Sequence, residues 1–269
     1  MPRAKIGIVV ATYNSERTLR ECLDSIMAQS FKDIDLYIQD GGSTDGTLKI
    51  IQEYGVARFS SEKDSGVYNA WNKALAQVDA EWITFLGSDD YFSSPSALSS
   101  VIEHLDAASE HGVNIVYGKN NLVDESGAFI SEVGLPWEAA SVDLKKKMTI
   151  RHPGCFHHAS LFEVGNGFDE SYKVIGDYHF ILRALREQEA GFYPFSVVTH
   201  RVGGLSNKPS LMMSIIRENF RLRKELALSP VYLVDSIFLK RLVLFLLSVV
   251  LGDRGVMKLL SIYSGALKK

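Results

Sequence analysis

The fold is decided by the stretch Trp82-Ile83-Thr84-Phe85-Leu86-Gly87-Ser88-Asp89-Asp90. Its opening apolar run is rich in β-branched and aromatic residues and predicts a buried strand, which the Gly-Ser pair ends. Asp89 and Asp90 follow at the carboxyl end of that strand, where open α/β sheets bind ligands. Adjacent carboxylates repel each other unless a cation lies near them, and Mg²⁺ and Mn²⁺ prefer oxygen ligands. The stretch therefore predicts a divalent-metal site, with a solvated Asp-Asp turn as the alternative.

Strands and helices are expected to alternate along the first part of the chain. Short apolar runs predict strands, and apolar residues at helical spacing predict the helices between them. The expected strands are 6–11, 34–39, 57–60 and 82–87, and the expected helices are 15–29, capped by Asn14 or Ser15, then 47–54 and 67–75. This alternation predicts an α/β fold with a mostly parallel sheet flanked by helices.

The pattern loosens in the second part of the chain. We expect helices at 94–111 and 177–189, strands at 113–117 and 192–201, and a β-hairpin at 122–133. A loop or short strand at 151–160 contains three histidines.

Composition narrows the class of protein. The chain has 269 residues, is 46% hydrophobic and carries a formal net charge of −3, so nothing indicates a nucleic-acid partner. Its two cysteines are far apart in sequence, which is typical of reduced thiols in a cytosolic protein. The N-terminus leads directly into a strand, without the pattern of a signal peptide.

The character of the chain changes at Pro209. One predicted helix carries several basic residues. The segment 231–251 that follows is strongly apolar but is interrupted by charged residues. Its longest uninterrupted run, 242–251, is about half of the ~20 residues that a membrane-spanning helix needs. A basic helix followed by an amphipathic one favours a segment lying on a membrane surface. A helix packed on the core, or in a homodimer interface, is the alternative. The basic residues are Arg217, Arg221, Arg223 and Lys224, and the apolar face is Phe238, Leu242, Phe245, Leu246 and Val249.

Five motifs together resemble the family 2 glycosyltransferases of the GT-A fold, nearest to bacterial enzymes that build O-antigen, capsule or exopolysaccharide repeats. The resemblance covers about residues 5–208. The motifs are Val10-Ala11-Thr12-Tyr13-Asn14, Asp40-Gly41-Gly42-Ser43-Thr44-Asp45-Gly46-Thr47, Asp64-Ser65-Gly66-Val67-Tyr68-Asn69-Ala70-Trp71-Asn72-Lys73, Gly87-Ser88-Asp89-Asp90 and Gly176-Asp177-Tyr178. The resemblance implies a catalytic domain at 1–208, with a nucleotide half at about 1–118 and an acceptor half at about 119–208. C-terminal amphipathic helices at 209–269 would follow it.

In this family the first turn and the end of the second strand hold the nucleoside of a sugar nucleotide, here expected to be a UDP-sugar. Tyr13 could stack on the base, and Asp40 could either accept the uracil N3–H or cap its own turn. Lys73 would suit the diphosphate, although a helical lysine is more often a solvated surface residue. The implied donor-binding residues are Thr12, Tyr13, Asn14, Asp40, Asp64, Gly66, Asn72, Lys73, Ser88 and Asp89.

The resemblance assigns the metal to Asp89 and Asp90, and Asp89 is the expected main ligand. Many relatives carry a further Asp where this chain has Gly87, which puts a ribose contact from that position in doubt. Asp177 matches the catalytic base, while from the residues alone it could equally be a helix N-cap. Weaker candidates for an acceptor or phosphate contact are His152 and His200.

The expected activity is inverting transfer of a sugar to a lipid-linked saccharide by a cytoplasmic protein bound peripherally to the inner face of the membrane. Two alternatives remain open at this point. One is a sugar-nucleotide pyrophosphorylase, and the other is a membrane-bound assembly protein that keeps the fold without turnover.

Overall fold

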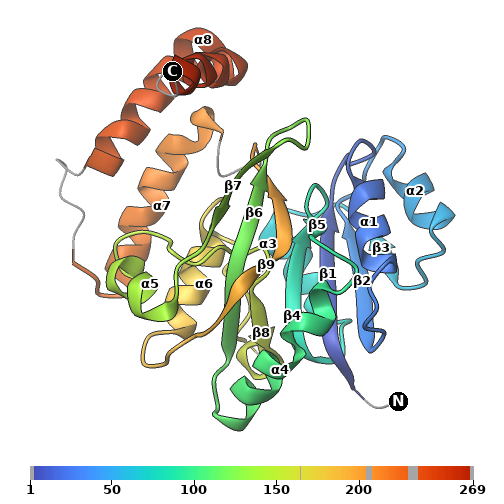
Figure 1. Ribbon diagram of the computed structural model, residues 1–269. Helices are drawn as coiled ribbons and strands as arrows, with labels where there is room; N and C mark the ends of the chain where they lie inside the picture. The colour runs from blue at the N-terminus through green and yellow to red at the C-terminus, as the bar shows by residue number, and fades with distance from the viewer. Residues whose placement is uncertain (1–2, 164, 204–207, 230–235, 267–269) are drawn as a thin grey trace. The chain divides into compact units, whose positions relative to one another are not determined.

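The computed structural model describes residues 3–163, 165–203, 208–229 and 236–266, and the chain divides into two compact units (Figure 1). The first unit consists of Met1–Ser171 and Gly176–Arg201. The second consists of Tyr172–Ile175 and Val202–Lys269. The second unit thus takes in four residues that directly precede Gly176 in the chain.

The first unit is built on one nine-stranded sheet, counted over the described residues, in the order β3-β2-β1-β4-β8-β6-β9-β5, with β7 paired to β6 (Figure 1). The strands are β1 (Ala4–Thr12), β2 (Ile34–Asp40), β3 (Phe59–Ser61), β4 (Ala80–Gly87), β5 (Tyr91–Phe92), β6 (Ile115–Val123), β7 (Phe129–Val133), β8 (Phe156–His158) and β9 (Gly191–Arg201). The helices of this unit are α1 (Leu19–Met27), α2 (Thr47–Glu53), α3 (Val67–Leu75), α4 (Ala97–Glu110), α5 (Trp137–Leu144) and α6 (Gly176–Ala184).

The first four strands are parallel, as the alternating pattern predicts. Residues Ile6, Ile8, Val9 and Val10 of β1 are fully buried, which explains why its sequence is continuously apolar. The register places Thr12 opposite Asp40 and Ala11 opposite Gly87, so β1, β2 and β4 end at the same edge of the sheet.

The rest of the sheet is mixed rather than parallel, so the α/β fold is confirmed but parallel strands predominate only in the first half. The short strand β8 pairs antiparallel with both β4 and β6, β6 runs parallel to β9, and β5 pairs antiparallel with β9. Three residues of β8 carry no alternation of their own, so a sequence pattern could not give its direction. The hairpin is confirmed as β6 and β7, and its turn is closed by Asp124, which accepts the N–H groups of Ser126 and Ala128.

Three helix predictions need correction. The first helix spans Leu19–Met27 and not 15–29, and a turn whose Ser15 carbonyl accepts the N–H groups of Thr18 and Leu19 leads into it. The Ser15 hydroxyl does not cap the helix, because it lies 2.8 Å from Ser88 Oγ. Helix α6 ends at Ala184 and not near residue 189. The residues at 186–189 are exposed and polar, so they have no apolar face to bury. Helix α5 was not expected, and only two of its residues, Ala140 and Leu144, are buried.

The second unit contains α7 (Met212–Glu225) and α8 (Ser236–Ala266). Gly252, with φ 66° and ψ 164°, interrupts α8 and divides it into two helical segments. Val174, Met212 and Ile215 form a small core, against which Leu244 and Phe245 of α8 pack.

This packing corrects part of the expected membrane face. Phe245 is turned toward the core of its unit, and Arg223 is buried with its Nε donating to the Ser229 carbonyl at 2.6 Å. Arg221 pairs with Glu225. Arg217 and Lys224 are exposed, whereas the side chain of Phe238 lies outside the described part of the structure.

Candidate active site

The loops that follow β1, β2 and β4 are tied together at the shared edge of the sheet. The Asn14 N–H donates to Ser43 Oγ at 2.8 Å, and Asn14 Oδ1 accepts the Thr44 N–H at 2.9 Å. Ser15 Oγ and Ser88 Oγ lie 2.8 Å apart, which joins the first turn to the acidic motif. Asn14 has φ 50°, a left-handed conformation that asparagine tolerates better than most residues. The structure therefore brings together three of the motifs that lie far apart in the sequence.

Asp40 is fully buried at the end of β2, and its carboxylate is already surrounded by donors. Oδ2 accepts the N–H groups of Gly42 and Ser43 and the hydroxyl of Ser61, while Oδ1 accepts the Ser43 hydroxyl. These four bonds match the number of lone-pair sites that a carboxylate has. The geometry supports the turn-capping alternative, and a direct contact of Asp40 with a base stays a prediction.

Tyr13 and Asp64 converge above Gly41. A Cβ atom at Gly41 would lie 2.5 Å from Asp64 Oδ2 and 3.4 Å from Tyr13 Cδ2, so a side chain there would displace the Asp64 carboxylate. Asp64 Oδ1 accepts the Gly66 N–H at 2.9 Å, and Gly66 has φ 135°, which favours glycine. The Tyr13 side chain is 62% exposed, so its ring is free to stack on a flat ligand.

The two carboxylates of the acidic motif converge on one point. A Cβ atom at Gly87 would lie 2.8 Å from Asp89 Oδ1 and 2.8 Å from Asp90 Oδ2. Burial raises the pKa of Asp89 above its usual value, and the charge of Asp90 raises it further. A nearby cation would remove this cost, so the pair fits the metal predicted from the sequence.

His200 lies near the end of β9 and contacts the same motif, although it follows Asp90 by 110 residues in the chain. Its Nδ1 lies 3.0 Å from Asp90 Oδ1, which also accepts the Arg201 N–H at 3.0 Å. Burial alone would lower the pKa of His200, but the hydrogen bond and charge of Asp90 raise it above its usual value. His200 is thus a partner of the predicted metal motif.

Arg201 was not recognised in the sequence. Its guanidinium group contacts the Asp89 carbonyl at 3.4 Å, the Glu125 carbonyl at 3.0 Å and the Glu21 carboxylate at 2.6 Å. It therefore ties the acidic motif to α1 and to the β6–β7 turn. The available signal was a basic residue next to a histidine at a strand end.

Within the described residues, no group of three or more histidines, cysteines and acidic residues is placed to hold a metal ion on its own. A metal at this site would accordingly take the carboxylates of Asp89 and Asp90 and complete its shell with phosphate oxygens and water, as Mg²⁺ usually does.

Asp177 is the second residue of α6 and lies in its first turn. Its Oδ1 accepts the Tyr178 N–H at 2.8 Å and the Tyr68 hydroxyl at 3.2 Å. Burial and then the charge of Asp177 raise the pKa of Tyr68 far above its usual value, so Tyr68 keeps its proton and acts as the donor. A Cβ atom at Gly176 would lie 2.8 Å from the Tyr68 ring, which makes glycine necessary for this approach. The third and fifth motifs therefore meet at this carboxylate.

Three predicted site residues have other partners. The Asn72 amide bonds both backbone groups of Phe168 and the Glu170 carboxylate, and Lys73 lies 3.2 Å from Glu62. His152 is buried, with its ring 4.8 Å from that of Trp71, and burial followed by the nearby His157 lowers its pKa well below the usual value. A neutral, buried imidazole offers no charge to a phosphate. Contacts of these three residues with a donor or acceptor stay predictions.

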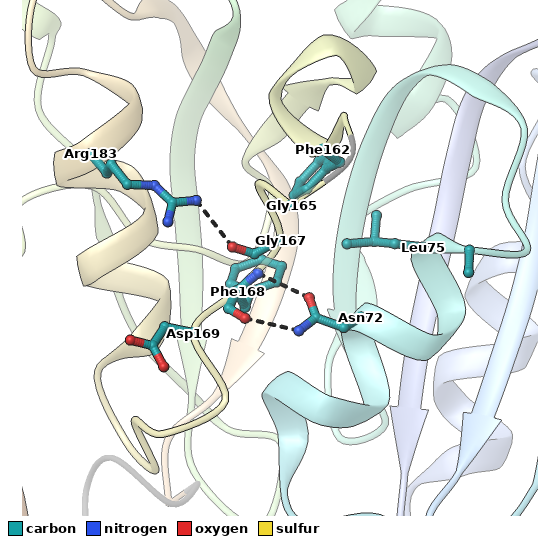
Figure 2. A pocket seen from close by; sticks show the side chains of 9 residues that line it. Asn72, Leu75, Phe162, Gly165, Gly167, Phe168, Asp169 and Arg183 are labelled. Carbon is teal, nitrogen blue, oxygen red and sulfur yellow. Dashed lines mark hydrogen bonds between the residues drawn. The ribbon is translucent and has the colours of Figure 1, made fainter.

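Asn72 also borders a hollow of about 540 Å³. Figure 2 shows its amide bonded to Phe168, with Arg183 of α6 bonded to Gly167 on the other side of the same hollow. Leu75 and Phe162 complete a lining that mixes apolar and polar groups. None of the residues assigned to the metal or to the base lines it.

The structure is that of an α/β protein with interlocked strand-end loops, paired carboxylates at the same sheet edge and a separate carboxylate on α6. A model of the family described as Glycosyl transferase family 2 matches residues 7–163, more than half of the chain. The chain belongs to this family and is a glycosyltransferase.

The named relatives that the chain resembles include a glycosyltransferase and a synthase. The chain is 29% identical over 219 residues to a PGL/p-HBAD biosynthesis glycosyltransferase of Mycobacterium bovis, which covers 77% of this chain and 81% of that protein. It is 30% identical over 182 residues to a chondroitin synthase of Escherichia coli, which covers 66% of this chain but 26% of that longer protein.

Solved structures share the GT-A fold. The mannosyltransferase PcManGT from Pyrobaculum calidifontis, in complex with GDP-Man and Mn²⁺, has a TM-score of 0.62 at 17% identity and covers 99% of this chain and 81% of that one. S. aureus TarS 1–349 in complex with UDP has a TM-score of 0.59 at 20% identity and covers 90% and 69%. In a longer TarS structure the chain spans 43% of that protein. At these identities the likeness shows the fold alone.

Proposed function

We propose that this glycosyltransferase moves a sugar, with inversion at the anomeric carbon, from a UDP-sugar to a lipid-linked saccharide during biosynthesis of a bacterial surface polysaccharide. The observation that carries the proposal is the convergence of the Asp89 and Asp90 carboxylates above Gly87, beside the interlocked loops after β1 and β2. The names of the relatives from M. bovis and E. coli support a glycan product.

In this proposal the strand-end loops hold the donor. Tyr13 stacks on the base, since its ring is exposed, and the loop from Asp64 to Gly66 closes beside it. Asp89 and Asp90 hold Mn²⁺ or Mg²⁺, which supplies positive charge to the diphosphate as it leaves. The structures of TarS with UDP-GlcNAc and of PcManGT with GDP-Man and Mn²⁺ support a sugar-nucleotide donor and a metal.

Asp177 takes the proton of the acceptor hydroxyl while the hydroxyl oxygen attacks the anomeric carbon of the donor and UDP leaves. Inversion needs one carboxylate in this role, and the hydroxyl of Tyr68 holds Asp177 Oδ1 in place. Family membership and the presence of both carboxylate sites favour transfer over a pyrophosphorylase or a protein without turnover.

A panel of sugar nucleotides tests the donor. We expect UDP-sugars with Mn²⁺ to raise the temperature of thermal unfolding, because a ligand at 100 times its Kd stabilises a fold by about 2.7 kcal/mol. GDP- and dTDP-sugars at equal concentration should give a smaller rise. Stabilisation by a GDP-sugar but not by any UDP-sugar would show that the donor assignment is wrong.

The C-terminal helix is the proposed membrane contact. Leu239, Val243, Leu246 and Val250 are exposed and recur at i, i+4, i+7 and i+11, which places them on one face of α8. No helix among the described residues is both long enough and apolar enough to cross a membrane. We propose that this stripe lies in the interface at the cytoplasmic face of the membrane and brings the site to a lipid-linked acceptor.

Polar substitution of this stripe tests the membrane contact. Leu246→Ser with Val250→Ser should lower binding to vesicles that contain anionic lipid, because less apolar surface enters the interface. The control is Val142→Ser, which changes an equally exposed valine on α5. Wild-type vesicle binding by the double variant would reject the contact, and a change from dimer to monomer in ultracentrifugation would assign the stripe to a second copy of the chain.

A further inference from the structure

Arg201 ends β9, and the sheet places this strand end between two turns. In the strand order β9 lies between β6 and β5. The strand β5 directly follows the acidic motif, and its Tyr91 pairs with Thr199. On the other side of β9, Arg201 pairs with Val123, the last residue of β6 before the β6–β7 turn. The backbone of Arg201 therefore lies beside both turns, and all of these residues belong to the first unit.

The guanidinium group of Arg201 makes four hydrogen bonds. Nε donates to the Asp89 carbonyl at 3.4 Å, and Nη2 donates to the Glu21 carboxylate at 2.6 Å. Nη1 donates to the carbonyls of Asp124 at 3.2 Å and Glu125 at 3.0 Å. An arginine head group carries five N–H donors in a planar fork, so most of its capacity is used by the protein itself. This geometry is that of a group that holds chain segments together, with little left to offer a phosphate.

The same residue touches both carboxylates of the acidic motif through its surroundings. The backbone N–H of Arg201 donates to Asp90 Oδ1 at 3.0 Å, and His200 Nδ1 contacts the same oxygen. The other oxygen, Asp90 Oδ2, is the one that converges with Asp89 Oδ1 above Gly87. A shift of the end of β9 would therefore rotate the Asp90 carboxylate, and loss of the guanidinium group would release the Asp89 carbonyl.

We infer that Arg201 is a positioning residue that fixes Asp89 and Asp90 in the arrangement that binds the divalent cation, an inference that rests on the proposed metal site. Groups that orient metal ligands commonly account for about 10- to 100-fold in metal affinity. Charge alone acts in the opposite direction, because the positive charge of Arg201 repels a divalent cation and its removal should tighten metal binding. The sign of the change thus separates positioning from charge.

Arg201→Gln in the full-length protein is the direct test. We expect the Kd for Mn²⁺, measured by electron paramagnetic resonance in the presence of UDP, to rise about 10-fold or more, with the Kd for UDP in excess chelator unchanged within about 2-fold. Arg201→Lys keeps the charge, but one ammonium group cannot reach the separate acceptors of a planar fork, so it should also weaken Mn²⁺ binding. Arg186→Gln, at an exposed position after α6, is the matched control and should bind both ligands as wild type does.

The outcomes separate three accounts of Arg201. Unchanged or tighter Mn²⁺ binding in Arg201→Gln would overturn the inference. Weaker UDP binding in excess chelator, with Mn²⁺ affinity unchanged, would also overturn it and assign the side chain to the diphosphate. Should Arg201→Gln not fold, Arg201→Lys carries the test, and wild-type Mn²⁺ affinity there would overturn the inference. Absence of Mn²⁺ binding by the wild-type protein with UDP would instead reject the proposed metal site itself.

Discussion

Replacing Asp89 with asparagine is expected to abolish metal-dependent sugar transfer, with kcat reduced by at least about 10²–10³-fold, the scale for losing one group that stabilises developing charge. The reason is the convergence of Asp89 Oδ1 and Asp90 Oδ2 on one point above Gly87. Asparagine keeps the shape but removes one of the two negative charges that would attract the cation. The fold should remain intact, because removing one of two repelling buried carboxylates costs little stability.

Metal binding gives a second readout that does not depend on turnover. Wild-type protein with UDP should be stabilised against thermal unfolding by added Mn²⁺, and Asp89→Asn should lose that increment. Asp90→Asn should lose it as well, because Asp90 Oδ2 converges with Asp89 Oδ1 above Gly87 as the second proposed ligand. Asp33→Asn, at an exposed position, is the control. Full activity in excess chelator would show that the metal assignment is wrong.

Replacing Asp177 with asparagine should lower kcat by about 10²-fold or more, the usual scale for a general base. The affinity for the donor should change little, since Asp177 comes from α6 and not from the loops after β1, β2 and β4. Isothermal titration with UDP and steady-state turnover measure the two effects separately.

A structural role for Asp177 predicts the opposite pattern. Loss of a helix cap costs about 1 kcal/mol of stability and leaves chemistry intact. Asp177 lies inside the first turn of α6, and its Oδ1 accepts the Tyr68 hydroxyl across 109 residues of sequence, which a cap alone does not require. A lower temperature of unfolding with wild-type kcat would nevertheless support the cap.

The sheet edge that carries the proposed donor site could be predicted because its signals are local. Each of β1, β2 and β4 is a continuous apolar run that ends in polar residues, so the sequence alone places Thr12, Asp40 and Asp89 at one sheet edge. The hydrogen bonds of Asp40 were not predictable, because two of its donors come from the loop that follows it and a third, Ser61, from another strand.

The proposed acceptor side depends on long-range pairing that no sequence pattern reports. His200 meets Asp90 because β9 pairs with the two-residue strand β5, which directly follows the acidic motif. Arg201 and Tyr68 act through contacts with residues that lie between 76 and 180 positions away. The helix prediction failed at Ser15 for a related reason, since Ser15 bonds Thr47 and Ser88 from distant loops instead of capping α1.

The membrane face shows how tertiary packing overrides helical spacing. Phe245 shares a helical face with Leu242 and Val249 in the sequence, but it packs on the core of the second unit. Compared with the face that the sequence spacing predicts, the exposed stripe of the helix is therefore rotated toward Val243 and Val250. Spacing identifies an amphipathic helix, whereas the choice of buried face depends on what the helix meets.

Sugar transfer from a UDP-sugar with inversion can be followed by proton NMR of a single reaction. The full chain is incubated with an α-linked UDP-sugar, a lipid-linked saccharide acceptor and Mn²⁺, and the anomeric signals are followed as UDP appears. We expect a new β-linked anomeric signal that grows in step with UDP release and grows at least about 10²-fold more slowly with Asp177→Asn. An α-linked product, or release of sugar 1-phosphate in place of UDP, would contradict the proposed inverting transfer.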